Sequence, residues 1–157
     1  MQKAALTLQR ATKEDIPFLC DLLGELFTKE SDFKKDYEKQ ERALHLIIAD
    51  EKIGHILVAK EDGKTLGMVS LLYTVSTALG AKVAMLEDMV VTNKEHNRGI
   101  GSALLSFAIE FASKQGCQRI TLLSDDDNTK AHAFYERHSF SFSHRKVLVK
   151  MLTCKDF

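Results

Sequence analysis

The amino-acid sequence predicts an α/β fold in which a central mixed, mostly antiparallel sheet is flanked by helices. Segments with strand-like and helical patterns follow one another in the order β-α-α-β-β-β-α-β-α-β. Strands joined by a short turn pair antiparallel, whereas strands joined through a helix lie parallel in the same sheet. The 157 residues contain no repeat and no Pro/Gly-rich linker, so we expect a single domain over residues 1–157.

The first third of the chain is expected to form one strand and two helices. Residues 6–11 alternate leucine with polar side chains at their start, as a half-buried strand does. Residues 12–15, Thr-Lys-Glu-Asp, supply oxygens that can accept hydrogen bonds from the free amides at a helix start. Apolar residues at helical spacing then predict helices over residues 16–27 and 37–49.

The remainder of the chain is expected to alternate strands and helices. A turn over residues 61–64, Glu-Asp-Gly-Lys, predicts that the strands on either side of it form an antiparallel hairpin. The strands are expected at residues 53–60, 65–73, 84–91, 119–123 and 145–152, and the helices at residues 99–115 and 129–138.

The charge balance and the cysteines narrow the classes of function. The chain has 22 basic and 22 acidic side chains, whereas nucleic-acid binding usually leaves a basic excess that neutralises phosphates. No apolar run approaches the roughly 20 residues that span a bilayer, and the first residues lack the apolar core of a signal peptide. Cys20, Cys117 and Cys154 form neither a CxxC pair nor a disulfide framework. We expect a soluble, cytoplasmic protein with reduced thiols that binds neither nucleic acid nor membrane.

The most informative segment joins the strand at residues 84–91 to the helix that follows it. A short polar loop leads to a Gly-x-Gly that opens the helix, in the run Arg98-Gly99-Ile100-Gly101-Ser102. Glycines let the backbone approach a phosphate closely, and the N–H groups at a helix start point toward it with the helix dipole behind them. Arg98 adds a positive charge at the same place. The segment predicts an anion cradle, although a glycine-rich turn without a ligand would fit the same residues.

Three phosphate-binding patterns compete for this loop. The P-loop pattern GxxxxGK[ST] fails because no lysine follows Gly101, and the dinucleotide pattern GxGxxG fails because Leu104 stands where the third glycine is required. The loop instead resembles [QR]xxGx[GA], the pyrophosphate loop of the GNAT acetyltransferases, which follows the fourth strand of their fold. The resemblance covers His96-Asn97-Arg98-Gly99-Ile100-Gly101, with His96 in place of the usual Gln or Arg.

A second segment resembles the other GNAT signature, NxxAxxFYxxxGF. The positions that match it in register are Asn128, Ala131, Phe134, Tyr135 and Phe140, and Ser139 replaces the usual glycine. The resemblance implies that Ala131 lets the pantetheine arm of coenzyme A lie close and that Tyr135 reaches its sulfur. In the family this tyrosine is commonly the general acid that protonates the leaving thiolate. A buried core tyrosine is the alternative, and the presence of both signatures in the family's order favours the catalytic role.

Two neighbouring carboxylates, Glu87 and Asp88, stand in the strand at residues 84–91, which we expect to be buried, where an unpaired acid is costly. The Leu-Glu-Asp-x-x-Val pattern resembles that of polyamine acetyltransferases, and aminoglycoside acetyltransferases have a similar glutamate. The resemblance implies that Glu87 binds a cationic amine and assists its deprotonation. A salt bridge from Glu87 to a neighbouring strand is the alternative. Alternation places Asp88 on the opposite face, in a structural role.

The same resemblance implies how the coenzyme lies along this strand. In the family the strand splays from its neighbour, and main-chain groups of Met89 and Val91 pair with the pantetheine arm. An N–H at or near Val90 polarises the acetyl carbonyl, as an oxyanion hole does. The expected coenzyme contacts are Met89, Val90, Val91, His96, Asn97, Arg98, Gly99, Ile100, Gly101, Ser102, Asn128, Ala131, Phe134 and Tyr135.

These segments together predict an enzyme that transfers acetyl from acetyl-CoA, its co-substrate, to an amine by direct attack, with Tyr135 and Glu87 as the catalytic residues. The neutral charge and the acidic strand favour a small cationic amine. A protein or peptide N-acetyltransferase and a non-catalytic acyl-CoA-binding sensor are the alternatives. No metal is expected, because the histidines lack metal-ligand spacing with cysteines or acids. Many GNAT proteins form homodimers, and nothing in the sequence determines the oligomeric state or the identity of the amine.

Overall fold

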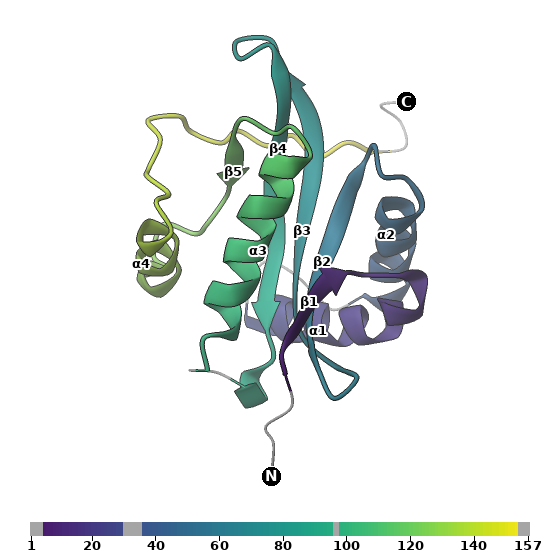
Figure 1. Cartoon of the computed structure of the whole chain (residues 1–157). Coiled ribbons are helices and arrows are strands. Elements are labelled where there is room, and N and C mark those ends of the chain that lie inside the picture. The colour runs from purple at the N-terminus through teal and green to yellow at the C-terminus, as the bar shows by residue number, and fades with distance from the viewer. Residues whose placement is uncertain (1–4, 30–35, 96–97, 154–157) are drawn as a thin grey trace. The chain divides into compact units, whose positions relative to one another are not determined.

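A computed structural model of the chain describes residues 5–29, 36–95 and 98–153 (Figure 1). The chain divides into two compact units, residues 1–123 and 124–157, and each unit is described by itself. In its described part, the larger unit holds a sheet and three α-helices, and the smaller unit holds one α-helix. The expectation of a single domain over residues 1–157 stays a prediction.

The larger unit is built on a five-stranded mixed sheet. Its strands lie in chain order, and every neighbouring pair is antiparallel except the last, which is parallel. The strands are β1 (Thr7–Arg10), β2 (Gly54–Glu61), β3 (Lys64–Ser76), β4 (Ala81–Val91) and β5 (Ile120–Leu122). The predicted mixed, mostly antiparallel sheet is confirmed. The one parallel pair, β4 and β5, is connected through the single helix α3, as the crossover argument expects. β1 and β2 are connected through two helices, α1 and α2, and pair antiparallel, so a helical connection by itself does not make two strands parallel.

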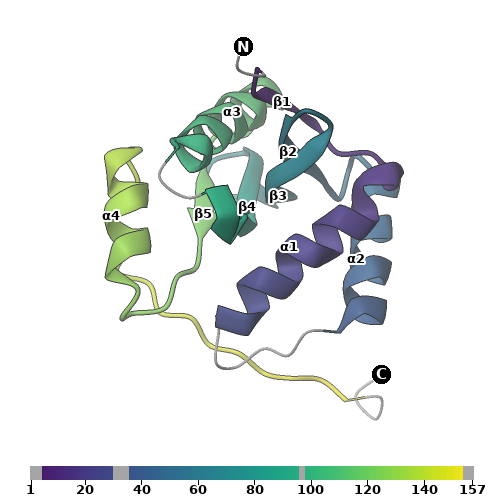
Figure 2. The same cartoon turned by 90° about the horizontal axis from the view of Figure 1, so that it is seen from below.

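Helices cover both faces of this sheet (Figure 2). α1 (Ile16–Lys29) and α2 (Tyr37–Ala49) lie on one face, and α3 (Ile100–Lys114) lies on the other. All three were expected from helical spacing, and the bounds of α2 agree with the prediction at both ends. Within the ranges that the structure describes, no helix has the length and the apolar content that crossing a bilayer would require.

The helix-start chemistry expected at residues 12–15 is present. The carboxylate of Asp15 accepts a hydrogen bond from the main-chain N–H of Thr12 at 2.8 Å, and residues 13–15 form a single 3-10 turn that leads into α1. Asp15 is buried, and the ammonium of Lys60 in β2 pairs with its second oxygen at 2.5 Å. A buried carboxylate is stable when it is paired in this way, so the first residues of α1 are fixed to the sheet.

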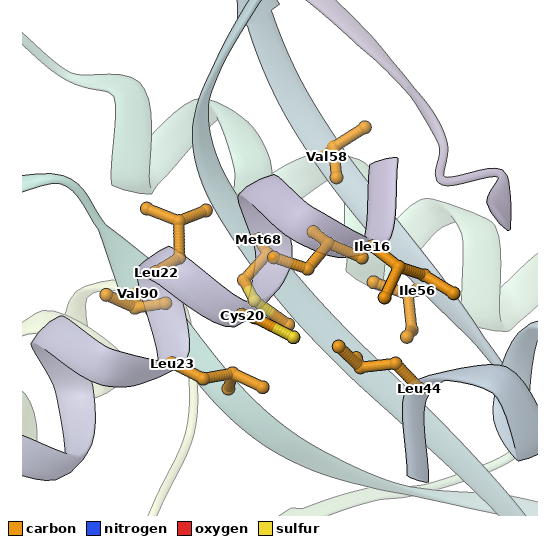
Figure 3. Packing of buried hydrophobic residues seen from close by; sticks show 10 residues of the cluster. Ile16, Cys20, Leu22, Leu23, Leu44, Ile56, Val58, Met68 and Val90 are labelled. Atoms are coloured by element: carbon orange, nitrogen blue, oxygen red, sulfur yellow. The ribbon is translucent and has the colours of Figure 1, made fainter. Parts of the chain in front are cut away.

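The core between α1, α2 and the sheet consists of one stripe of each helix and alternate residues of the strands (Figure 3). The buried residues of this cluster are Ile16, Leu19, Cys20, Leu22, Leu23, Leu44, Ile56, Val58, Met68 and Val90. Because successive strand residues face opposite sides, Leu57 and Val69 are buried on the other face, which α3 covers with Leu104 and Leu105. Complete burial of one leucine stabilises the fold by roughly 1.5–3 kcal/mol, so both faces contribute to stability.

The smaller unit contains α4 (Thr129–Arg137), as the sequence predicts. The strand expected over residues 145–152 is wrong, because these residues take up neither helix nor strand in the structure. The apolar run Val147-Leu148-Val149, with basic residues on both sides, has the composition of a strand. A strand also needs a neighbour with which its main-chain groups exchange hydrogen bonds, and the pattern says nothing about that neighbour.

Candidate active site

A β-bulge interrupts β4 within the predicted acceptor segment. Met68 of β3 lies opposite Val90, whereas Ser70 lies opposite Glu87, so two residues of β4 face the single residue between them on β3. The first of the two, Asp88, has a φ of 53°, in the left-handed region that non-glycine residues rarely adopt. Bulges of this kind bend a strand and change the direction of its side chains. The strict alternation that placed Asp88 opposite Glu87 therefore ends here.

The two carboxylates of this segment differ in exposure. Glu87 is exposed and Asp88 is half-buried, so the expectation that this part of the strand is buried is wrong for Glu87. Glu87 is still in register with Ser70, directly before the bulge, and it is the first residue of β4 beyond the end of the β5 ladder, so no β5 residue lies beside it. An exposed glutamate carries no desolvation cost, and its charge is available to a cation from solvent.

The two edges of β4 have different neighbours along this segment. On one edge, β4 pairs with β3 as far as Val91. On the other edge, β5 runs beside β4 only from Ala84 to Leu86 and then ends. The ladder between β4 and β5 therefore stops before Glu87. The three predicted pantetheine contacts Met89, Val90 and Val91 all lie beyond this point.

The turn after β4 is fixed to α1. The carboxylate of Glu25 accepts hydrogen bonds from the main-chain N–H of Asn93 at 3.1 Å and from the hydroxyl of Thr92 at 3.3 Å. The N–H of Thr92 in turn donates to the carbonyl of Leu66 in β3 at 2.8 Å. A 3-10 turn, η2 (Asn93–Glu95), follows. These bonds determine where the chain leaves the sheet on its way to α3.

Gly99 forms the N-cap of α3 with a φ of 74° and without any side-chain cap. A Cβ atom at this position would meet no atom within 4 Å, so the space beside the turn is open. The helix that begins at Ile100 directs the main-chain N–H groups of its first turn, including those of Gly101 and Ser102, toward its N-terminal end. This geometry suits an oxygen anion, because the amides and the helix dipole both favour negative charge there.

The guanidinium of Arg98 is held by two carboxylates. It donates to Glu61 at the end of β2 at 2.7 Å and to Glu95 of η2 at 2.5 Å. These hydrogen bonds, that to Glu61 first, raise the pKa of Arg98 above its already high ordinary value, so the group stays charged. The positive charge expected at this turn is present, and two negative charges lie directly beside it.

The second predicted signature lies on α4 in the smaller unit. The side chain of Asn128 is the N-cap and accepts from the N–H of Ala131 at 3.2 Å. The Tyr135 ring packs edge-on against Phe134 and Phe140, at centroid distances of 5.2 and 5.6 Å. Burial raises the pKa of Tyr135 to about 12, so the phenol keeps its proton at neutral pH and is a weaker acid than an exposed phenol.

Ser139 follows α4 in the conformation that the family's glycine would adopt. Its φ is 68°, and the N–H of the next residue, Phe140, donates to the carbonyl of Tyr135 at 3.1 Å. The turn is therefore retained with serine in place of glycine, at the cost of a left-handed conformation for a residue with a side chain.

Two of the predicted site segments follow one another along the chain of the larger unit. Residues 87–91 and 98–102 lie at the two ends of the passage from β4 through η2 to α3. His96 and Asn97 lie outside the described residues. Within the part of the chain that the structure describes, no group of three or more acids, histidines and cysteines has the arrangement of a metal site.

Three carboxylates at this turn were missed by the sequence analysis, namely Glu25, Glu61 and Glu95. Glu25 precedes its partner Asn93 by 68 residues, and Glu61 precedes Arg98 by 37. Neither distance follows from a local pattern, so only the folded chain could reveal these two contacts. The spacing of Glu95 and Arg98 at three residues is the one local signal, since such pairs often form salt bridges on a helical turn.

Comparison with known proteins identifies the family of this chain. Residues 16–140 match the acetyltransferase (GNAT) family. YhfO, an uncharacterized N-acetyltransferase of Bacillus subtilis, is 32% identical over 85 residues, which are 54% of this chain and 57% of that protein. The matched region thus spans little more than half the length of YhfO. The aminoalkylphosphonate N-acetyltransferase of Salmonella typhimurium is 28% identical over 137 residues, which are 87% of this chain and 86% of that protein.

Among solved structures, an aminoglycoside N-acetyltransferase in complex with CoA is similar, with a TM-score of 0.79 at 14% sequence identity. The similarity covers 96% of this chain and 97% of that chain, and at this identity it shows the fold alone. The family match extends from the start of α1 to Phe140 and so includes the β4 bulge, the Gly99 turn and all of α4. The chain belongs to the acetyltransferase (GNAT) family.

Proposed function

We propose that this protein is an N-acetyltransferase that passes an acetyl group from acetyl-CoA to a small cationic amine by direct attack. The observation that carries the proposal is the passage from β4 into α3. There a bulged strand, which β5 accompanies only as far as Leu86, leads through the 3-10 turn η2 to a glycine at a φ of 74° that opens α3. The family match over the same residues supports the assignment.

The residues at this turn suit the diphosphate of coenzyme A. The open space at Gly99 lets an anion approach the backbone, and the amides of Ile100, Gly101 and Ser102 are oriented to donate to it. The edge of β4 from Met89 to Val91 would hold the pantetheine arm, since the β5 ladder ends at Leu86. Asn128, Ala131 and Phe134 of the α4 segment are proposed to complete the binding site, on the strength of the family signature.

Glu87 is the proposed recognition group for the amine. Its exposed carboxylate stands at the bulge, next to the proposed pantetheine edge of β4. A carboxylate in this position would attract an ammonium group and would hold the proton that the nitrogen must lose before it can attack. A small cationic amine is preferred on this ground. The relative from Salmonella typhimurium is named for a class of small amines, the aminoalkylphosphonates.

The proposed chemistry assigns one task to each residue. When bound, acetyl-CoA supplies the thioester whose acetyl group is transferred. Glu87 takes a proton from the ammonium, directly or through water, and the nitrogen lone pair then attacks the acetyl carbon. The main-chain N–H at or near Val90 donates to the acetyl oxygen as negative charge develops on it. Tyr135 protonates the sulfur as the carbon–sulfur bond breaks, the amide nitrogen loses its second proton to solvent, and solvent restores the phenol.

A covalent route through a cysteine is less consistent with the structure. Cys20 and Cys117 are free thiols, and Cys154 lies outside the described residues. Burial raises the pKa of the Cys117 thiol and also that of the Cys20 thiol, so both are held in the unreactive protonated form. Direct attack of the amine on the thioester needs no such nucleophile.

The test is an acetyl-CoA-dependent thiol-release assay with a panel of polyamines, aminoglycosides, aminoalkylphosphonates, amino acids and peptides. Turnover with one of the small cationic amines is the expected result. Coenzyme binding without thiol release from any amine would instead indicate a non-catalytic acyl-CoA sensor. Turnover with peptides alone would indicate a protein N-acetyltransferase, and a protein that does not bind the coenzyme would contradict the proposal as a whole.

A further inference from the structure

Three charged side chains from separate elements meet beside the Gly99 turn. Arg98 lies directly before the glycine, Glu61 ends β2, and Glu95 ends η2. The two carboxylates contact the same guanidinium at 2.7 and 2.5 Å. Arg98 is an exposed residue, and the two carboxylate side chains are 20% and 30% exposed. A guanidinium has five N–H donors in a planar fork, so it can hold two carboxylates at once. We call this group the Arg98 cluster.

The charge of the Arg98 cluster argues against a simple phosphate contact by arginine. One positive and two negative charges leave one net negative charge at a turn where an anion is expected to bind. Carboxylates at this place repel an anion, so they would weaken its binding unless they serve another purpose. Both carboxylates are bonded to Arg98, which immediately precedes the anion cradle. Holding this arginine in place is a purpose that these contacts fit.

The geometry of the chain explains why this turn needs such support. Glycine populates positive and negative φ about equally, so Gly99 by itself does not keep the turn in one conformation. Glu61 belongs to a tight hairpin, in which Asp62 and Gly63 both have positive φ and connect β2 directly to β3. The ion pair from Glu61 thus connects the flexible glycine turn to one of the rigid parts of the sheet. Glu25 fixes the other end of the passage through Asn93.

We propose that Arg98 is a positioning residue and not a phosphate ligand, and that Glu61 and Glu95 hold it so that the amides of the first turn of α3 are preorganised for the diphosphate. This inference rests on the proposed function, because that function identifies the anion as the diphosphate of coenzyme A. It goes beyond that function because it gives Glu61 and Glu95 the role of holding Arg98. The main-chain amides then supply the anion contacts, and the side chain of Arg98 supplies the geometry.

The test exchanges the arginine at position 98 with the glutamate at position 61, so that the Arg98 cluster still consists of one arginine and two glutamates. Arg98→Glu alone places three carboxylates together, and adding Glu61→Arg restores one arginine between two glutamates. For coenzyme A, measured by calorimetry on the full chain, we expect Arg98→Glu to weaken binding about tenfold and the exchanged pair to recover most of the loss. If Arg98 is a ligand, the exchanged pair binds as weakly as the single variant, and this result would overturn the proposal.

Glu61→Gln gives a second, opposite expectation. A positioning role predicts weaker coenzyme binding, because the guanidinium loses a charged partner. A ligand role predicts tighter binding and a steeper dependence on salt, because the arginine is released toward the phosphates. The matched control is Lys114→Glu, which breaks the exposed pair of Lys114 with Glu110 at the other end of α3. This control should change neither the coenzyme affinity nor the hydrogen exchange of the Gly99 turn.

Amide hydrogen exchange at Ala103, whose N–H donates to the carbonyl of Gly99 at 3.0 Å, separates this inference from the proposed function when it is measured in the protein without coenzyme. The expected result is exchange faster by about tenfold in Arg98→Glu and restored protection in the exchanged pair. Unchanged exchange in Arg98→Glu would contradict the positioning role even if the coenzyme binds. Faster exchange in a protein that does not bind the coenzyme would support the positioning role and contradict the proposed function.

Discussion

The Nδ1 atom of His55 lies 2.7 Å from the hydroxyl oxygen of Tyr73, across the β2–β3 ladder. The imidazole is buried, with 6% exposed, and its edge packs on the ring of Phe111 in α3 at a centroid distance of 4.8 Å. Its Nε2 atom lies 4.0 Å from the carboxylate of Glu51, which also pairs with Arg10. The phenol can donate to an unprotonated Nδ1 or accept from a protonated one, so the protonation state of His55 is decided by its surroundings and not by this contact.

The first prediction concerns the pH dependence of stability. Burial lowers the pKa of His55, as do Arg10 and Lys82, and Glu51 opposes them. The folded pKa thus lies below the unfolded value of about 6.5, and the unfolded chain binds the proton more readily. The stabilisation is complete above about pH 6.5 and is lost as the pH falls toward the folded pKa, by at most about 1.4 kcal/mol per pH unit.

Urea denaturation at about pH 5 and about pH 7.5 checks this expectation. The difference in unfolding free energy between the two pH values should shrink in His55→Gln. It should persist in His45→Gln, whose side chain is 56% exposed in α2. An equal pH difference in the wild type and in His55→Gln would show that another group controls it.

The second prediction separates backbone strain from coenzyme binding at Gly99. Gly63 and Gly99 have φ angles of 73° and 74°, and a Cβ at either position would meet no atom within 4 Å. Alanine at either position should therefore lower the unfolding free energy by about 1–2 kcal/mol, the cost of a left-handed conformation. Only Gly99→Ala should also weaken coenzyme binding in calorimetry. Equal coenzyme affinities in the two variants would remove Gly99 from the site.

The third prediction concerns the turn after α4. Because Ser139 has a φ of 68°, Ser139→Gly should relieve strain and raise the unfolding free energy of the smaller unit by about 0.5–1 kcal/mol. Ser106→Gly, at an exposed position inside α3, should have the opposite effect on its own helix. Hydrogen exchange of the amides of α4 and α3 measures the two changes separately. A loss of protection in α4 on Ser139→Gly would contradict the strain argument.

The fourth prediction tests the role of Glu87. Glu87→Gln should lower kcat/KM for the amine by about 10- to 100-fold, because the base and the negative charge are both lost. Coenzyme affinity should stay unchanged. The matched control is Glu110→Gln, a similarly exposed glutamate on α3. Steady-state thiol release measures both variants, and a Glu87→Gln enzyme with wild-type kcat/KM would exclude Glu87 from amine recognition and proton removal.

The fifth prediction tests the general acid. Tyr135→Phe should lower kcat by about 100-fold, because the leaving thiolate loses its proton donor. Coenzyme affinity should change little, since the ring contacts with Phe134 and Phe140 are retained. Tyr37→Phe is the control, because the hydroxyl of this exposed tyrosine is 3.0 Å from Asp21 and has no proposed catalytic role. Unchanged kcat in Tyr135→Phe would remove this residue from the mechanism.

The contrast between α2 and residues 145–152 shows which kind of secondary structure a local sequence pattern is sufficient to predict. The stripe of α2 has Leu44 as its buried centre, and the helix satisfies its own main-chain hydrogen bonds, so its bounds followed from the pattern. A strand depends on a neighbour that lies elsewhere in the sequence. The apolar run at residues 147–149 could not show whether such a neighbour exists, and the strand expected over residues 145–152 is not formed.

At the candidate site, the sequence by itself determined the kinds of chemistry. Glycine at position 99, the carboxylate at 87 and the phenol at 135 are properties of single residues in short motifs, and such motifs are local. Only the tertiary structure decided the bulge at Asp88, the early end of β5 and the two carboxylates on Arg98. These features depend on strand register and on contacts between residues up to 37 positions apart. Register and distant charge pairs are set by how the whole chain packs, and no short stretch of sequence contains that information.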